Sequence, residues 1–193
     1  MTVYGALYVE DLYTEGLHSV QVFGVLIEPT MTATASIIGK TYPLLFVGWG
    51  VFQSIALTLN VLYLYRRYGY KSKAGYALLA LGTLCIISTV FIRSTEEPGL
   101  QRTAHWATAL LFAFLYAIAM GMCLLSLAKK SRKFLGTFIF FVAMLALMLA
   151  LLIFVGKGGA IESIPMWGVY VILLLTNFTG MYKESLAEPI RNA

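Results

Sequence analysis

Charged side chains are scarce in this sequence. Only 12% of the 193 residues are Asp, Glu, Lys or Arg, whereas 60% are hydrophobic and the mean hydropathy is +0.81. Soluble domains carry about 25% charged residues. A chain of this composition would not stay dissolved, which excludes a soluble globular protein.

Charge is missing altogether from five long apolar runs. They cover Pro43 to Tyr65, Ala74 to Ile92, Ala104 to Ala128, Phe134 to Gly156 and Ile164 to Tyr182. At 1.5 Å per residue, each can cross a hydrocarbon core of about 30 Å. The runs lack the alternation of barrel strands, so helices are expected. We predict an all-α integral membrane protein with a single bundle of five transmembrane helices in residues 43–182.

The lack of ionisable groups in these runs also limits the function. Proton relays, voltage sensors and ion-coupled carriers place such groups inside the membrane. A charge-translocating role is therefore disfavoured, unless Glu28 lies in the membrane. No run shows the interrupted, repeated halves of a secondary transporter.

Cysteine and histidine are rare, with two of each. The expected depths of Cys85 and Cys123 differ by about 9 Å, more than a disulfide spans, so both are interpreted as packing residues. Two histidines without matched depth disfavour haem, and no HxxxH or HExxH spacing indicates zinc. We expect no cofactor and no metal.

The charges that are present indicate the topology. Basic residues gather in two loops and the tail of residues 183–193: Arg66, Arg67, Lys71, Lys73, Lys129, Lys130, Arg132, Lys133, Lys183 and Arg191. Basic loops stay in the cytoplasm, so the net charge of +5 reflects orientation in the cell membrane and not nucleic-acid binding. The stretch Ser94 to Phe112 then faces outward.

Residues 1–42 lack both a spanning run and the basic start of a signal peptide. One interpretation is an outward-facing cap with aromatic residues at the head-group level. The alternative is a sixth, Pro-kinked helix from Leu17 to Gly39 that buries Glu28 in the bundle.

The outward stretch collects Glu96, Glu97 and His105, and Thr103 is a candidate N-cap for the helix that His105 begins. Three roles are open. These residues and His18 could bind zinc through tertiary folding, His105 with Glu96 or Glu97 could act as an acid/base pair on a lipid head group, or the group could be a structural clasp.

Small and uncharged polar residues mark the helices. Ala109, Ala113, Ala117 and Gly121 form a ridge that suits close helix packing, within the protein or against another membrane protein. Polar residues within the runs are Gln53, Ser54, Asn60, Thr83, Ser88, Thr89, Thr176, Asn177 and Thr179. They are interpreted as interhelical hydrogen-bonding groups, or alternatively as the lining of a groove for lipid or a small molecule.

Three segments together resemble a known family: TASIIGKTYPLLFVGWG, YLYRRYG and STEEPGLQRTAHWATALLFAFLYA. They look like the damage-regulated autophagy modulators, the FGF-receptor-activating-protein group and their bacterial relatives. The matching positions are Ser36, Gly39, His105, Ala109 and Phe112. The resemblance implies a six-helix membrane protein of lipid organisation, although a clear first spanning helix is missing here. We therefore expect a lipid-associated protein or accessory membrane subunit without its own catalysis, with membrane lipids and possible helices of other membrane proteins as partners.

Overall fold

Five long helices account for most of the described chain. The computed structural model describes residues 43–92, 99–154, 161–179 and 182, and the backbone alone of residues 20–22, 25–27 and 159–160. The helices are α4 (Pro43–Arg67), α5 (Lys73–Phe91), α6 (Leu100–Ala128), α7 (Arg132–Phe154) and α8 (Gly159–Phe178). All five contain apolar stretches long enough to cross a membrane. The predicted all-α bundle of five transmembrane helices is confirmed.

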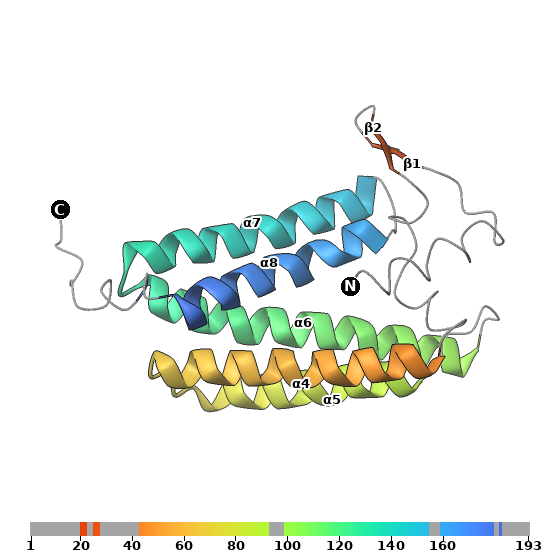
Figure 1. Ribbon diagram of the computed structural model, residues 1–193, viewed down its shortest axis with the longest axis horizontal. Coiled ribbons are helices and arrows are strands. Elements are labelled where there is room, and N and C mark those ends of the chain that lie inside the picture. Colours follow the sequence, from red (N-terminus) through yellow and green to blue (C-terminus); the bar gives the residue numbers. More distant parts are fainter. Residues whose placement is uncertain are drawn as a thin grey trace.

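The helices lie side by side and alternate in direction along the bundle (Figure 1), and their contacts close a ring. Each helix packs against the next one along the chain, and α8 also packs against α4. Because five is an odd number, the two helices that close the ring point in the same direction. The α4–α8 contact is thus a parallel one, and no short loop connects its two helices.

Short connections hold α4 to α5 and α6 to α7. After α4 the chain turns at Gly69, whose φ of +64° lies in the left-handed region that favours glycine. Ser72 then caps α5, its hydroxyl accepting from the Gly75 N–H at 3.1 Å. We call this end of the bundle the basic end, since it carries Arg66, Arg67, Lys71, Lys73, Lys129, Lys130, Arg132 and Lys133. Its cytoplasmic location stays a prediction.

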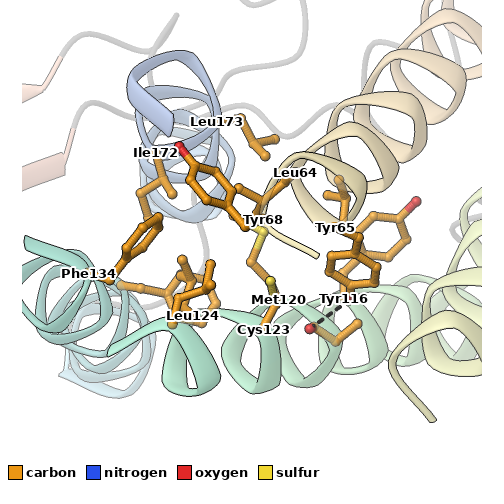
Figure 2. Close-up of a cluster of buried hydrophobic side chains, with 14 of the residues drawn as sticks. Leu64, Tyr65, Tyr68, Tyr116, Met120, Cys123, Leu124, Phe134, Ile172 and Leu173 are labelled. Atoms are coloured by element: carbon orange, nitrogen blue, oxygen red, sulfur yellow. Dashed lines mark hydrogen bonds between the residues drawn. The ribbon is translucent and has the colours of Figure 1, made fainter. Parts of the chain in front are cut away.

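The core lies toward the basic end. Figure 2 shows Leu64, Leu124 and Phe134 converging with Ile172 and Leu173 around Tyr68. The rings of Tyr68 and Phe134 meet edge to face, with centroids 4.9 Å apart. Large side chains elsewhere point outward, as Phe154 does with 85% of its surface exposed. Such outward apolar surface is what a helix presents to lipid tails, so only the part of each helix that faces its neighbours is buried within the protein.

The boundaries of α6 and α8 differ from the predicted ones. Helix α6 begins at Leu100 with Gly99 as its N-cap, so Thr103 is not the cap. The Thr103 hydroxyl instead donates to the Gly99 carbonyl, 3.1 Å away, inside the first turn. At the other end of the chain, α8 stops at Phe178, four residues before the end of the predicted run.

Little of residues 1–42 is described. Strands β1 (Val20–Val22) and β2 (Val25–Ile27) pair antiparallel, with Val20 opposite Ile27. The strands lie within the range considered for a sixth helix, so these residues are not helical. The remainder, with Glu28, lies outside the described residues, and the choice between a cap and a membrane-embedded segment stays a prediction. The tail of residues 183–193 also lies outside them.

Candidate functional site

The contact between α4 and α8 carries polar residues at a seven-residue repeat. On α4 these are Gln53, Asn60 and Arg67, and on α8 they are Tyr170 and Asn177. A seven-residue step returns nearly to the same helix face, so each set forms one row. Gln53 meets Tyr170 and Asn60 meets Asn177 with the same sequence offset of 117, as expected for parallel helices in register. We call these five residues the α4–α8 polar seam.

Hydrogen bonds cross this seam at successive depths. The Tyr170 hydroxyl donates to Gln53 Oε1. About 10 Å closer to the basic end, at 1.5 Å per residue, Asn177 Nδ2 donates to the Asn60 carbonyl at 2.9 Å. The Asn60 side chain itself donates to Ala56 O within α4 at 2.8 Å. All four side chains in this part of the seam, those of Gln53, Tyr170, Asn60 and Asn177, are uncharged.

At the basic end, the last turn of α4 caps α8. Arg67 donates through Nη1 to the Asn177 carbonyl and through Nη2 to the Thr179 carbonyl, the latter at 3.1 Å. The Tyr68 hydroxyl donates to Thr176 O at 2.7 Å. The last carbonyls of a helix have no partner within it and carry its negative partial charge, so a guanidinium suits this position.

Aromatic rings fix the guanidinium in place. Its Cζ lies 6.0 Å from the ring centre of Tyr63 and 5.9 Å from that of Tyr68. Burial raises the pKa of the Tyr68 phenol above its ordinary value of 10.0, and the neighbouring Arg67 opposes this. The phenol therefore stays protonated at neutral pH and keeps donating to α8.

Two complementary groups of the seam have no partner. Asn177 Oδ1 and Arg67 Nε are buried and make no hydrogen bond within the described residues; a third such atom there, Ser131 Oγ, lies outside the seam. The Asn177 side chain is 1% exposed. An unmet buried donor or acceptor costs about 1–3 kcal/mol. An acceptor and a donor thus remain available beside the contact that joins Arg67 to Asn177.

A second polar group lies on the other side of α4. The hydroxyls of Thr58, Thr83 and Tyr116 join α4, α5 and α6: Tyr116 is 2.6 Å from Thr58 and 2.9 Å from Thr83, and the threonines are 3.0 Å apart. We call these three residues the hydroxyl cluster. Each threonine also donates within its own helix, to Ser54 O and Leu79 O. The hydroxyl cluster is consequently self-satisfied and offers less to a ligand than the seam does.

His105 lies at the opposite end of the bundle and is turned into the protein. Its side chain is 6% exposed. Nδ1 lies 2.7 Å from the carbonyl of Ile92, the C-cap of α5. A carbonyl can only accept, so Nδ1 carries the proton. His105 therefore ties the end of α5 to α6, as a clasp would.

Most partners proposed for His105 cannot be placed. Glu96, Glu97 and His18 lie outside the described residues, as do the family-motif positions Ser36 and Gly39. Catalysis by His105 with either glutamate stays a prediction. Within the described ranges, no three side chains of the metal-binding types His, Cys, Asp and Glu gather at one point. Cys85 and Cys123 are both free thiols, so the prediction that they do not pair is confirmed.

The small-residue ridge of α6 is only partly used within the bundle. Ala117 packs against the core, and a Cβ on Gly121 would lie 3.6 Å from the Phe141 ring of α7, whereas Ala113 is exposed. An i, i+4 series drifts by about 40° per step, which carries part of it off the contact face. The buried face of α6 instead runs through larger residues: Tyr116, Met120, Cys123, Leu124 and Leu127. Ala109 and Phe112 are half-buried beside it.

The sequence of the helical region decides the family. A sequence model of the AmiS/UreI family transporters matches residues 42–191, which take in all five helices. The chain belongs to the AmiS/UreI family. The resemblance to the damage-regulated autophagy modulators and the FGF-receptor-activating-protein group is thus wrong: its motifs were short and lay in apolar sequence that many membrane helices share. No curated protein and no solved structure matches the chain.

As an AmiS/UreI family member, the chain is a multi-pass membrane protein of transporter type. The lipid-organising role followed from the mistaken resemblance and has no support from the AmiS/UreI match. Sequence reasoning identified Gln53, Asn60 and Asn177 as polar groups of interest, but it missed Tyr170 and counted Arg67 only as a loop charge. The seven-residue spacing of Gln53, Asn60 and Arg67 was the feature of the sequence that could have placed Arg67 on the same helix face as the other two.

Proposed function

We propose that the chain transports a small, uncharged, polar solute through the membrane along the α4–α8 polar seam. Membership of a transporter family supports movement of a solute as the activity. The seam supplies hydrogen-bonding groups at several depths across a bundle that is otherwise apolar on its surface. Such groups replace the water that a polar solute loses on entering the membrane.

The observation that carries this proposal is the unpartnered carbonyl oxygen of Asn177. It is buried, it belongs to the row of polar groups, and it can accept an N–H or O–H from a solute. Arg67 Nε, which also lacks a partner, can donate to a carbonyl oxygen of the same solute. A molecule with both a donor and an acceptor thus fits the seam better than one with either alone.

Charge supports an uncharged solute. From position 43 to 65 and from 164 to 179, α4 and α8 contain no Asp, Glu, Lys or Arg. A charged solute would cross this region without a counter-charge on the two helices that form the seam, at a large desolvation cost. A neutral solute requires hydrogen bonds only, which the seam provides.

Solute uptake by proteoliposomes tests the proposal. After mixing with urea, acetamide or glycerol, vesicles that hold wild-type protein should recover their volume faster than protein-free vesicles, as followed by stopped-flow light scattering. Asn177→Leu keeps the number and branching of the side-chain heavy atoms but replaces both polar atoms with methyl groups. It should slow uptake about three- to tenfold, the effect of losing roughly one hydrogen bond of about 1 kcal/mol from the barrier.

Ser88→Ala is the matched control. Ser88 is a polar residue of α5 whose hydroxyl bonds only to Leu84 O of its own helix and faces outward, so uptake should stay at the wild-type rate. Wild-type vesicles no faster than protein-free ones for any of the three solutes would reject transport of this class. Equal rates for Asn177→Leu and wild type would reject the seam as the pathway.

A further inference from the structure

We propose that Arg67 makes the α4–α8 polar seam selective against cations, by occupying the carbonyls at the end of α8 with a fixed positive charge. This inference rests on the proposed function, since it assigns a specificity-determining residue to the same pathway. It concerns the exclusion of cations from the seam and not the identity of the neutral solute.

The end of α8 would attract cations if it were open. The last carbonyls of a helix are unpaired and carry about half a negative elementary charge. Clustered backbone carbonyls are also the ligands with which channels replace the water shell of a metal cation. Here these carbonyls lie next to Asn177, at the basic end of the seam. A polar pathway that ends on bare carbonyls would therefore favour cations along with neutral solutes.

Arg67 covers this end. Its two Nη groups hold the carbonyls of Asn177 and Thr179, while Tyr68 holds that of Thr176. The charge is permanent, because a guanidinium does not lose its proton in proteins. It is also held in position between the rings of Tyr63 and Tyr68. Arg67 Nε remains unpaired within the described residues and extends the positive field into the seam.

Arg67 differs in its burial from Arg66, Lys129 and Arg132 at the same end of the bundle. Arg66 is exposed and belongs to the loop surface, as do Lys129 and Arg132. Charges on that surface are screened by salt within about 8 Å at physiological ionic strength. Arg67 is half-buried beside unpaired polar atoms, where its field is screened far less. The selectivity is thus assigned to one residue and not to the net charge of +5.

Rubidium flux into proteoliposomes tests this inference. Wild-type protein should pass little more Rb⁺ than protein-free vesicles, whereas Arg67→Gln should raise the flux at least about tenfold, because it removes the charge and exposes carbonyls. Arg67→Lys is the control that retains a positive charge but cannot hold two carbonyls in the same fork. It should stay within about threefold of wild type. Equal gains for Gln and Lys would overturn the charge barrier, since loosened packing would then explain both.

A second variant covers the case in which Arg67→Gln does not fold. Asn177→Asp has the same shape and adds a negative charge to the residue whose backbone carbonyl Arg67 holds, so it offsets the positive charge while Arg67 stays in place. Rb⁺ flux should rise here too, and no rise in a folded Asn177→Asp protein would overturn the inference. The two assays separate this inference from the proposed function. If wild-type protein takes up urea, acetamide or glycerol quickly but passes as much Rb⁺ as Arg67→Gln does, the cation barrier is rejected and the neutral-solute transport is retained.

Discussion

At the scale of single residues, hydroxyl groups hold three helices together away from the seam. The three hydroxyls of the cluster contact one another. Because both threonines donate to carbonyls of their own helices, the Tyr116 hydroxyl is the donor between helices. In a membrane, such interhelical hydrogen bonds contribute about 0.6 kcal/mol each, because the unfolded helices also find partners in the bilayer. The cluster therefore specifies which faces of α4, α5 and α6 meet more than it stabilises the bundle.

Removing the phenol oxygen tests this. Tyr116→Phe deletes two of the three contacts in the hydroxyl cluster and keeps the ring. The free energy of unfolding should fall by about 0.6 kcal/mol, the membrane value for one interhelical bond, because the two threonine protons go to Ser54 O and Leu79 O and Tyr116 supplies the one remaining proton. Reversible unfolding in mixed detergent micelles would measure it, with Ser88→Ala as the surface control. A loss several times larger would mean that the cluster has a role beyond interhelical hydrogen bonding.

His105 makes a different residue-scale prediction. Its Nδ1–H is bonded to the C-cap carbonyl of α5, so His105→Ala should leave that carbonyl without its partner and lower the free energy of unfolding by about 1–3 kcal/mol. Thermal unfolding in detergent measures this, and neutral-solute uptake by the folded fraction should persist. A folded, equally stable variant that lost uptake would instead make His105 part of the transport machinery.

At the scale of helices, close approach is set where a glycine faces a ring. A Cβ on Gly82 of α5 would lie 2.6 Å from Cδ2 of Tyr116 on α6, nearer than real side chains come. The glycine thus lets α6 present its tyrosine to the hydroxyl cluster. This gives α5, most of whose residues are apolar, one defined contact face toward α6.

Alanine substitutions separate this packing from helix propensity. Gly82→Ala should destabilise the bundle by about 1–3 kcal/mol because the Tyr116 ring must move. Gly136→Ala on α7 meets nothing within 4 Å, so it should be neutral or stabilise by up to about 1 kcal/mol through helix propensity. Unfolding in mixed micelles compares the two. A stabilising Gly82→Ala would contradict the close α5–α6 contact.

Helix-scale features also separate what the sequence predicted from what it missed. The apolar runs predicted all five helices, because the bilayer demands a length of about 20 residues and excludes charge. The ends were less certain: Gly99 replaced Thr103 as the cap of α6 because helix ends depend on local geometry as much as on side-chain type. Roles such as that of Arg67 depend on which helix lies beside α4, and a single sequence does not contain that pairing in any local pattern.

At the scale of the whole molecule, the arrangement of the ring decides where the candidate site forms. Among the larger helix contacts of the described residues, the α4–α8 contact joins the helices farthest apart in sequence, and it carries polar groups at a repeating spacing. The antiparallel contacts, by contrast, could be foreseen from short loops. The polar residues were predicted as hydrogen-bonding groups, and the structure adds that Asn60 and Asn177 meet across the α4–α8 contact.

The parallel closure of the ring also has a consequence for biogenesis. Helices α4 to α7 can pack with their neighbours as each one leaves the ribosome, since the larger contacts among them join consecutive helices. The α4–α8 polar seam is incomplete until α8 has been synthesised and inserted, because Asn177 and the carbonyls that Arg67 binds belong to the end of that helix. A chain that ends before α8 thus leaves the polar row of α4 without its partner helix. The Arg67 guanidinium, half-buried in the folded protein, is then uncovered as well. These unpaired polar groups on α4 distinguish an incomplete chain from the folded protein within the membrane.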